Sequence, residues 1–188
     1  MTVMRDLPTE LLTPRLVLRP PQPGDGEALY EAVAASLPAL RAWPSSLAWA
    51  QHEQSVQGLE QFARESAANW LLRSELTLLV WAREGGQLVG ATGLHALDWT
   101  MQRGETGWWG NTTMHGQGKM REAVRAVLDF AFAHCGLRRV SCVTDVRNER
   151  SRRLAEAVGL QAEGLLRGYY PEGDGMLYAR LAGDEARA

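Results

Sequence analysis

The sequence predicts an α/β fold in which strand-like and helix-like segments alternate around a mixed sheet. Two strand-like runs, Glu75–Arg83 and Gln87–Leu94, are separated by Gly85-Gly86, a pair typical of a hairpin turn. Further along, apolar residues recur at the i, i+4, i+7, i+8, i+11 spacing of an amphipathic helix, namely Met120, Val124, Val127, Leu128 and Ala131. A hairpin and an amphipathic helix in one chain indicate a sheet covered by helices.

The first part of the chain predicts one strand and two helices. Three prolines, the first at Pro20, stop the short alternating strand before them. Leu29 and Val33, four residues apart, give the first helix an apolar face. The predicted elements are a strand at Arg15–Leu18, a helix at Gly24–Ser36, an irregular segment at Pro38–Trp49 and a helix at Gln51–Trp70.

The second part of the chain predicts four more strands and two helices. The helix at Glu149–Val158 ends at Gly159, a residue type favoured just after a helix. The other predicted elements are strands at Gly104–Trp109 and Val140–Val146, the helix that begins near Met120, and two strands around the Pro171–Gly175 turn. The expected order is βααβββαβαββ, and we expect residues 1–188 to form a single domain.

Composition excludes several classes of function. With 45% hydrophobic and 22% charged residues the chain is expected to fold, and a net charge of −2 gives no basic surface for nucleic acid. No apolar run approaches the roughly 20 residues of a membrane span, and the first residues lack the apolar segment of a signal peptide. The two cysteines, Cys135 and Cys142, favour a reduced, cytoplasmic protein. The histidines and cysteines share no metal-ligand spacing, so no metal is expected.

The stretch from His115 to Met120 places two glycines, Gly116 and Gly118, directly before the amphipathic helix. Unpaired N–H groups at a helix start attract anions, and glycines let a phosphate approach the backbone. A Walker loop would need a glycine where Thr113 stands and Ser or Thr after Lys119, and a dinucleotide fingerprint would need a third glycine further on. Two readings therefore stay open from the residues alone: a phosphate loop, or a tight turn.

Longer segments resolve this choice. The segments "GETGWWGNTTMHGQGKMREAVRAVLDFAF" and "VTDVRNERSRRLAEAVGLQAEGLLRG" resemble the GNAT superfamily of acyl-CoA N-acyltransferases, and within it the RimJ/RimL type that acetylates protein N-termini. The resemblance extends from "TPRLVLRP" to "GYYPEGDGMLYARL" and covers nearly the whole chain. It implies a GNAT fold, with a mixed, mostly antiparallel and splayed sheet flanked by helices. It also implies an acetyl-CoA-dependent enzyme that transfers the acetyl group directly in a ternary complex.

The resemblance also implies which residues bind acetyl-CoA. In the family, the amides of a Gln/Arg-x-x-Gly-x-Gly/Ala loop hold the CoA pyrophosphate, and a splayed strand edge pairs with the pantetheine. Here the loop departs from that pattern at its first and last residues, and the strand edge departs at Gly110, where the family has a bulky apolar residue. Because strand residues alternate, we expect the two tryptophans at this edge not to line one surface. The implied loop residues are His115, Gly116, Gln117, Gly118, Lys119 and Met120, and the implied edge residues are Trp108, Trp109 and Gly110.

Two polar residues are implied in the reaction. From the residues alone, Asn148 is a helix N-cap and Ser151 an ordinary first-turn residue. By resemblance, Asn148 contacts the pantetheine arm and Ser151 protonates the departing CoA thiolate. A thiolate whose conjugate acid has a pKa of about 8.5 is a fair leaving group that a hydroxyl can assist. These roles are compatible with capping of the helix, and we favour the functional interpretation of both residues.

The amine must lose a proton before or during attack on the thioester. Glu105 aligns with a glutamate of the family's "AEIGYW" segment and is the preferred proton acceptor, which would act through water. An exposed strand-edge carboxylate, or a partner in a salt bridge, is an equally good interpretation of this residue. His95 ranks second, because a lone histidine in an apolar run is more often a hydrogen-bonded core residue. No strong base is evident, which favours a protein N-terminal α-amine as substrate.

The amine site is expected between the Pro38–Gln54 segment and the Tyr169–Gly175 turn. Its expected substrate contacts are Trp43, Trp49, His95 and Tyr170. The alternatives are a small-molecule amine (an amino acid, a polyamine or an aminoglycoside) and a non-catalytic acyl-CoA-binding module. No nucleic acid or membrane partner is expected, and a homodimer stays open.

Overall fold

The computed structural model describes residues 6–184. Its elements are β1 (Leu11–Leu12), β2 (Leu16–Arg19), α1 (Gly26–Leu40), α2 (Val56–Leu72), β3 (Leu76–Ala82), β4 (Leu88–Asp98), β5 (Arg103–Gly110), α3 (Lys119–Ala133), β6 (Arg139–Asp145), α4 (Glu149–Ala157), β7 (Gln161–Tyr170) and β8 (Gly173–Leu181), with short 3₁₀ turns η1 (Ala48–Gln51) and η2 (Thr112–Met114). No helix in this range is long and apolar enough to cross a membrane. The predicted α/β order is confirmed, with one added strand, β1.

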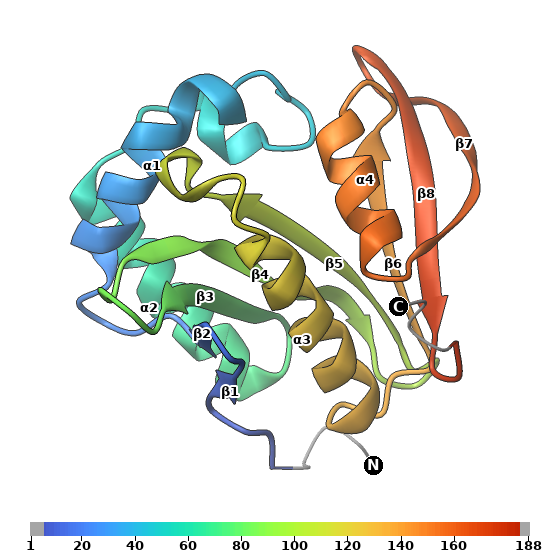
Figure 1. The fold of residues 1–188 in the computed structure, drawn as a ribbon, viewed down its shortest axis with the longest axis horizontal. Coiled ribbons are helices and arrows are strands. Elements are labelled where there is room, and N and C mark those ends of the chain that lie inside the picture. Colours follow the sequence, from blue (N-terminus) through green and yellow to red (C-terminus); the bar gives the residue numbers. More distant parts are fainter. Residues whose placement is uncertain (1–5, 185–188) are drawn as a thin grey trace.

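All eight strands form one sheet in the order β1-β2-β3-β4-β5-β6-β8-β7. Every neighbouring pair is antiparallel except β5 and β6, which run parallel. The predicted mixed, mostly antiparallel sheet is therefore confirmed. α3 crosses one face of the sheet, and α4 lies over β6 on the same face, packed into the same core (Figure 1).

Both faces of the central strands are buried. On β3, Leu78 and Val80 join the core under α3, whereas Leu79 between them packs beneath α1 and α2. A strand buried on both faces needs a nearly continuous apolar sequence, which "LTLLVWA" provides. The α3 stripe that begins with Val124 and Val127 is fully buried on this sheet, as its spacing predicts. The central strands are thus packed between α3 on one face and α1 and α2 on the other.

Two helix boundaries differ from the prediction by four residues or more, the end of α1 and the start of α2. α1 continues through Pro38 to Leu40, because a proline near the end of a helix removes only one late hydrogen bond. α2 begins at Val56 and not at Gln51, because Ser55 caps it: the Ser55 side chain accepts a hydrogen bond from Gly58 N at 3.0 Å. The polar residues before Ser55 therefore belong to the segment that joins α1 and α2.

Candidate active site

The glycine loop begins α3 in a conformation that favours glycine. Gly116 has φ +80° and Gly118, the N-cap of α3, has φ +70°, both in the left-handed region. No side chain caps this helix, so the N–H groups of its first turn stay open. A Cβ built on Gly116 would meet nothing within 4 Å, which leaves open space above the loop. The loop therefore fits an anion such as a pyrophosphate.

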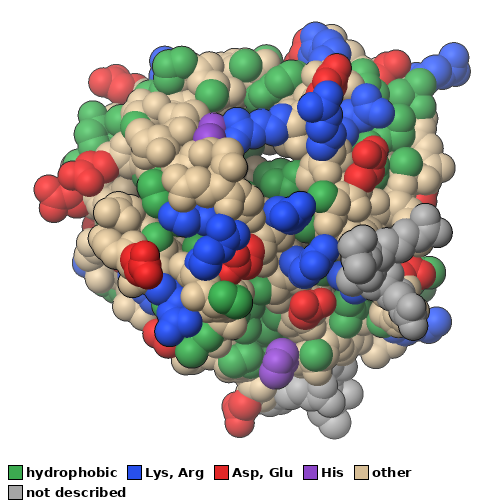
Figure 2. All heavy atoms as spheres, in the orientation of Figure 1, with side chains coloured by type: hydrophobic (Ala, Val, Ile, Leu, Met, Phe, Trp, Pro, Cys, Tyr) green, Lys and Arg blue, Asp and Glu red, His purple; other side chains and the backbone are tan. Residues whose placement is uncertain are grey.

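The N-terminal segment braces this loop. Arg15 donates from Nη1 to the Gln117 carbonyl at 2.8 Å and forms an ion pair with Glu122 of α3 at 2.6 Å. A neighbouring cavity of about 750 Å³ is lined by three arginines and three carboxylates, so its charges balance: Arg15, Arg121, Arg125, Glu10, Glu122 and Asp129. Basic side chains also gather on this face of the molecule, around a hollow in its surface (Figure 2). The contacts of Arg15 thus fix the position of the loop, and the basic side chains around the hollow favour a negatively charged ligand.

His115 links β5 to α4. Its Nε2 lies 3.2 Å from the Gly110 carbonyl and its Nδ1 lies 2.7 Å from Nη1 of Arg150. Burial, and secondly the Arg150 charge, lower the pKa of His115. A neutral ring satisfies both contacts, because Nδ1 then accepts from the guanidinium while Nε2–H donates to the carbonyl.

The sheet splays between β5 and β6. Their pairing stops at Glu105 and Ser141, although β5 continues to Gly110 and β6 to Asp145. The two strands diverge toward the segment that joins α1 and α2 (Figure 1). A cavity of about 110 Å³, here called the splay cavity, lies in this opening. It is lined by Trp43, Ser46, Leu47, Thr106, Gly107, Trp108, Cys142, Val143, Thr144, Asn148 and Ser151.

Asn148 and Ser151 both lie in the wall of the splay cavity. The Asn148 side chain accepts a hydrogen bond from Ser151 N at 3.0 Å, so it caps α4 as the residues predict. This bond uses only the oxygen of the amide and leaves its NH₂ group for a ligand. The hydroxyl of Thr144, also in this wall, is buried and has no hydrogen-bond partner in the described part of the chain. The cavity therefore presents polar groups that a ligand would satisfy.

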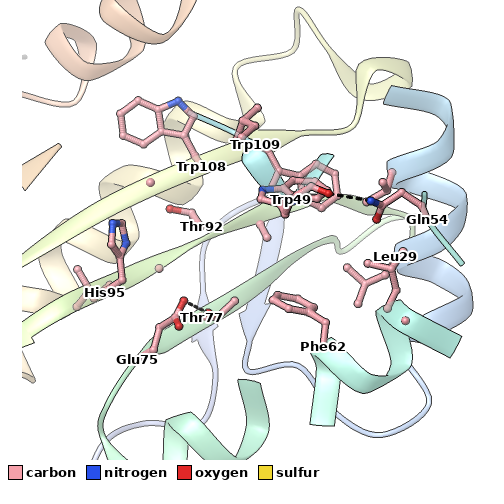
Figure 3. Close-up of a pocket in the computed structure, with 18 of the residues that line it drawn as sticks. Leu29, Trp49, Gln54, Phe62, Glu75, Thr77, Thr92, His95, Trp108 and Trp109 are labelled. Carbon is pink, nitrogen blue, oxygen red and sulfur yellow. Dashed lines mark hydrogen bonds between the residues drawn. The ribbon is translucent and has the colours of Figure 1, made fainter. Parts of the chain in front are cut away.

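Another cavity, here called the amine cavity, lies on the other side of β5 from the splay cavity and has a volume of about 580 Å³ (Figure 3). Leu47, Gly107 and Trp108 line both cavities, so the two meet at this strand. Trp49 and His95 also line the amine cavity, where the sequence predicts substrate contacts.

The two tryptophans of β5 pack against different parts of the core. Trp108 packs against the core under α3, and Trp109 against the cluster beneath α1 and α2. Alternation is thus as expected, but both residues contribute to the wall of the amine cavity. The two side chains therefore lie on opposite faces of the sheet, as alternation predicts, and the Trp109 ring is the one that packs beside Trp49.

His95 and Glu105 form a pair on neighbouring strands. Nε2 of His95 lies 3.7 Å from Oε2 of Glu105, and both side chains keep more than 40% of their surface exposed. The His95 ring lies over Gly107, where a Cβ would come within 3.5 Å of its Cε1. Of the two, only His95 lines the amine cavity. The imidazole of His95 therefore lies beside Gly107, which lines both cavities, whereas the Glu105 carboxylate lies outside the amine cavity.

The remaining expected substrate contacts lie elsewhere. Trp43 lines the splay cavity, and Tyr170 lines neither of the two cavities. Tyr170 is buried, with its hydroxyl 3.4 Å from the Val143 carbonyl, and burial raises its pKa. The two segments expected to wall the site do meet: Ser45 donates to Glu172 from both its N–H and its hydroxyl, at 3.0 and 2.5 Å.

Three further residues of the amine cavity were not singled out from the sequence. Phe62, Glu75 and Thr92 line it from α2, the start of β3 and β4 (Figure 3). These three residues are far apart in the sequence, and only the packing of three elements brings them together. No local motif therefore marks them as part of a site. Among residues 6–184, no group of three His, Cys, Asp or Glu side chains could hold a metal ion.

Comparison with known proteins identifies the family. The family model described as "Acetyltransferase (GNAT) domain" matches residues 15–161 of this chain. The chain belongs to the GNAT acetyltransferase family. It is an enzyme of the N-acetyltransferase class, because relatives with that name match along most of their length.

Several relatives of this GNAT chain are named for ribosomal proteins. It is 29% identical to the Bacillus subtilis (strain 168) "Putative ribosomal N-acetyltransferase YdaF" over 163 residues, which are 84% of this chain and 85% of that protein. The structure of a "putative ribosomal-protein-serine acetyltransferase" from Vibrio cholerae superimposes with a TM-score of 0.75 at 25% identity, covering 92% of this chain and 97% of the other. A structure of RimL, a ribosomal L7/L12 alpha-N-protein acetyltransferase in complex with coenzyme A, superimposes with a TM-score of 0.79 at 21% identity, covering 95% and 99%.

The three departures from the GNAT pattern contact one another. A Cβ at Gly110 would lie 3.1 Å from Cγ of Met120 and 3.5 Å from Nε2 of His115. A Cβ at position 110 would be tight against Met120 and in ordinary contact with His115, so a bulkier residue there would require the Met120 side chain to shift. The glycine, the histidine and the methionine form one packing arrangement, so each departure accommodates the others.

Cys142 is the one thiol in the wall of the splay cavity. It is 3% exposed, and burial, followed by the Glu105 charge, raises its pKa to about 12. Since the thiolate is the nucleophilic form, this residue is poorly suited to carry an acetyl group.

Proposed function

We propose that this GNAT acetyltransferase uses acetyl-CoA to acetylate the α-amino group at a protein N-terminus. The observation that carries this proposal is the meeting of two cavities at Gly107 and Trp108, one in the strand opening and one on the amine side. Two substrates bound in them would have their reactive groups side by side. Proximity of this kind allows direct transfer without a covalent enzyme intermediate.

The residues from the glycine loop to the splay cavity match successive parts of acetyl-CoA: the pyrophosphate, the pantetheine arm and the thioester. The open amides of Gly116–Met120 would hold the pyrophosphate, with Arg150 and His115 beside them. The β5 edge Trp108–Gly110 and the free NH₂ of Asn148 would face the pantetheine amides. RimL, which shares the fold, has been solved with coenzyme A bound. The thioester would then lie in the splay cavity, whose free hydroxyls include that of Thr144.

Acetyl-CoA supplies the acetyl group: the amine nitrogen bonds to the carbonyl carbon, the C–S bond breaks, and CoA leaves as a thiolate. Ser151 would donate a hydrogen bond and then a proton to that sulfur. His95 would accept the proton that the amine loses, with Glu105 stabilising the charged ring. The geometry thus favours His95 as the first acceptor and Glu105 as its partner, which reverses the order expected from the sequence.

The pKa of the amine supports an α-amino substrate. An α-amino group with a pKa near 8 is about one-tenth neutral at pH 7, whereas a lysine with a pKa of 10.4 is neutral in about one molecule in 2,500. The exposed His95–Glu105 pair has access to bulk water and can relay a proton. It is a modest base system and suits the amine that is already partly neutral.

Two matched peptides test the substrate. One has a free N-terminus and no lysine, and the other has a blocked N-terminus and one lysine. Mass spectrometry after incubation with acetyl-CoA should find acetylation of the first peptide only. Preference for the blocked peptide would contradict the N-terminal assignment, and acetylation of neither peptide together with turnover of a small amine would replace it.

A further inference from the structure

The amine cavity is larger than a small N-terminal residue requires. Its volume of about 580 Å³ is in the range of pockets that enclose a drug-sized molecule. A serine or alanine side chain would leave most of it to water. The chemical nature of the residues that line the cavity therefore indicates which kind of substrate occupies it.

One end of the cavity is apolar. Trp49 and Trp109 face each other with ring centroids 6.0 Å apart and an interplanar angle of 56°, and Phe62 and Leu29 continue this surface (Figure 3). Trp49 is 37% exposed and Phe62 is 38% exposed, although both side chains are apolar. Solvated aromatic residues gathered in a concave wall are typical of a binding site.

The other end of the cavity is polar. His95 and Glu75 lie there, away from Phe62 and Leu29 (Figure 3). The imidazole and the carboxylate are the polar groups that an amine would meet at this end. Thr92 also borders the cavity, but it pairs with Leu78 and Trp108, so its side chain lies on the opposite face of the sheet, under α3. The Glu75 carboxylate, held at 3.0 Å by the Thr77 hydroxyl, adds a negative charge that attracts an ammonium group.

We propose that the amine substrate carries a bulky apolar or aromatic group, which fills the Trp49–Phe62 end while its amine lies at the Glu75–His95 end. The inference rests on the acetyltransferase function proposed above and specifies its substrate. For a peptide, the first residue would be phenylalanine, leucine or a similar residue, and not serine or alanine. The same chemistry occurs in free amines such as phenethylamine and phenylalaninamide.

The experiment measures kcat/KM with short peptides that differ only in the first residue, Ser, Ala, Leu or Phe, and with the two free amines. Burial of the larger side chain should favour the Phe and Leu peptides over the Ser peptide by about 10- to 100-fold. Phe62→Ala should raise KM for the Phe peptide about 10-fold and leave the Ser peptide nearly unchanged. Leu71→Ala, on the same helix and with an exposed apolar side chain outside the cavity, is the matched control and should change neither.

Each outcome bears on a separate claim. Equal or faster acetylation of the Ser peptide by the wild-type enzyme would overturn the inference and leave the N-terminal function standing. Turnover of the free aromatic amines in preference to every peptide would support the apolar pocket but overturn the protein substrate. Acetylation of none of these amines would contradict both. Thermal melts of Phe62→Ala, compared with Leu71→Ala, show whether a loss of activity reflects unfolding.

Discussion

Replacing Ser151 with alanine removes one hydroxyl from the wall of the splay cavity and keeps the cap of α4. The cap uses the backbone N–H of Ser151, which donates to Asn148 at 3.0 Å, and the hydroxyl makes no hydrogen bond within the described residues. Alanine is also the better helix former. The variant should therefore fold with an unchanged or slightly higher melting temperature.

The expected kinetic effect follows from the charge on the departing sulfur. A hydrogen bond to a charged group contributes about 1.5–3 kcal/mol, which corresponds to a fall of about 10- to 150-fold in the rate of the chemical step. Because the sulfur is charged only as the bond breaks, KM for acetyl-CoA should stay nearly constant.

The assay is CoA release in a single turnover, followed with a thiol-reactive chromophore, so that product release does not mask the chemical step. Ser74→Ala, in the loop before β3 and outside both cavities, is the kinetic control: it loses the hydrogen bonds of its hydroxyl to Asn69 but should keep the wild-type single-turnover rate. An unchanged single-turnover rate in Ser151→Ala would refute the reasoning. A rise in KM at constant rate would assign the hydroxyl to ground-state binding.

Three further predictions test neighbouring groups. Asn148→Asp keeps the capping oxygen but loses the NH₂ donor, so KM for acetyl-CoA should rise without a loss of stability, whereas Asn148→Ala should also lower stability by about 0.5–2 kcal/mol in chemical denaturation. Glu105→Gln should lower kcat moderately, and the defect should shrink as the pH approaches 9, where the amine deprotonates itself; a defect constant with pH would contradict a role in proton relay. His115 has a lowered pKa through burial and Arg150, so its contribution to stability should be complete above about pH 6.5 and disappear as the pH falls through the lowered pKa. Denaturation of wild type and His115→Asn at pH 7.5 and 5.5 checks this, and an equal difference at both values would count against it.

The order of the elements could be predicted because each long element carries its own local pattern. The continuous apolar run of β3 and the 3.6-residue stripe on α3 are both local properties of the chain. β1 was missed since Leu11–Leu12 is a strand only through its pairing with Val17 and Leu18. Such a short edge strand carries no sequence signal of its own.

The CoA loop could likewise be found from sequence, since glycines before a helix have a local physical meaning. The joint packing of Gly110, His115 and Met120 could not, because the positions are apart in sequence and each reads as a separate departure. The polar and apolar ends of the amine cavity were also hidden. Glu75 and Phe62 carry no sequence signal of a site, because only the fold places them in the wall of one cavity.

The most direct test of the account is a turnover experiment with acetyl-CoA and a peptide amine, in which CoA release and the masses of peptide and enzyme are measured together. Direct transfer predicts one acetyl group on the peptide for each CoA released, and no acetylated enzyme when the peptide is omitted. Thermal stabilisation by acetyl-CoA without CoA release in the presence of any amine would contradict the account and indicate a binding module.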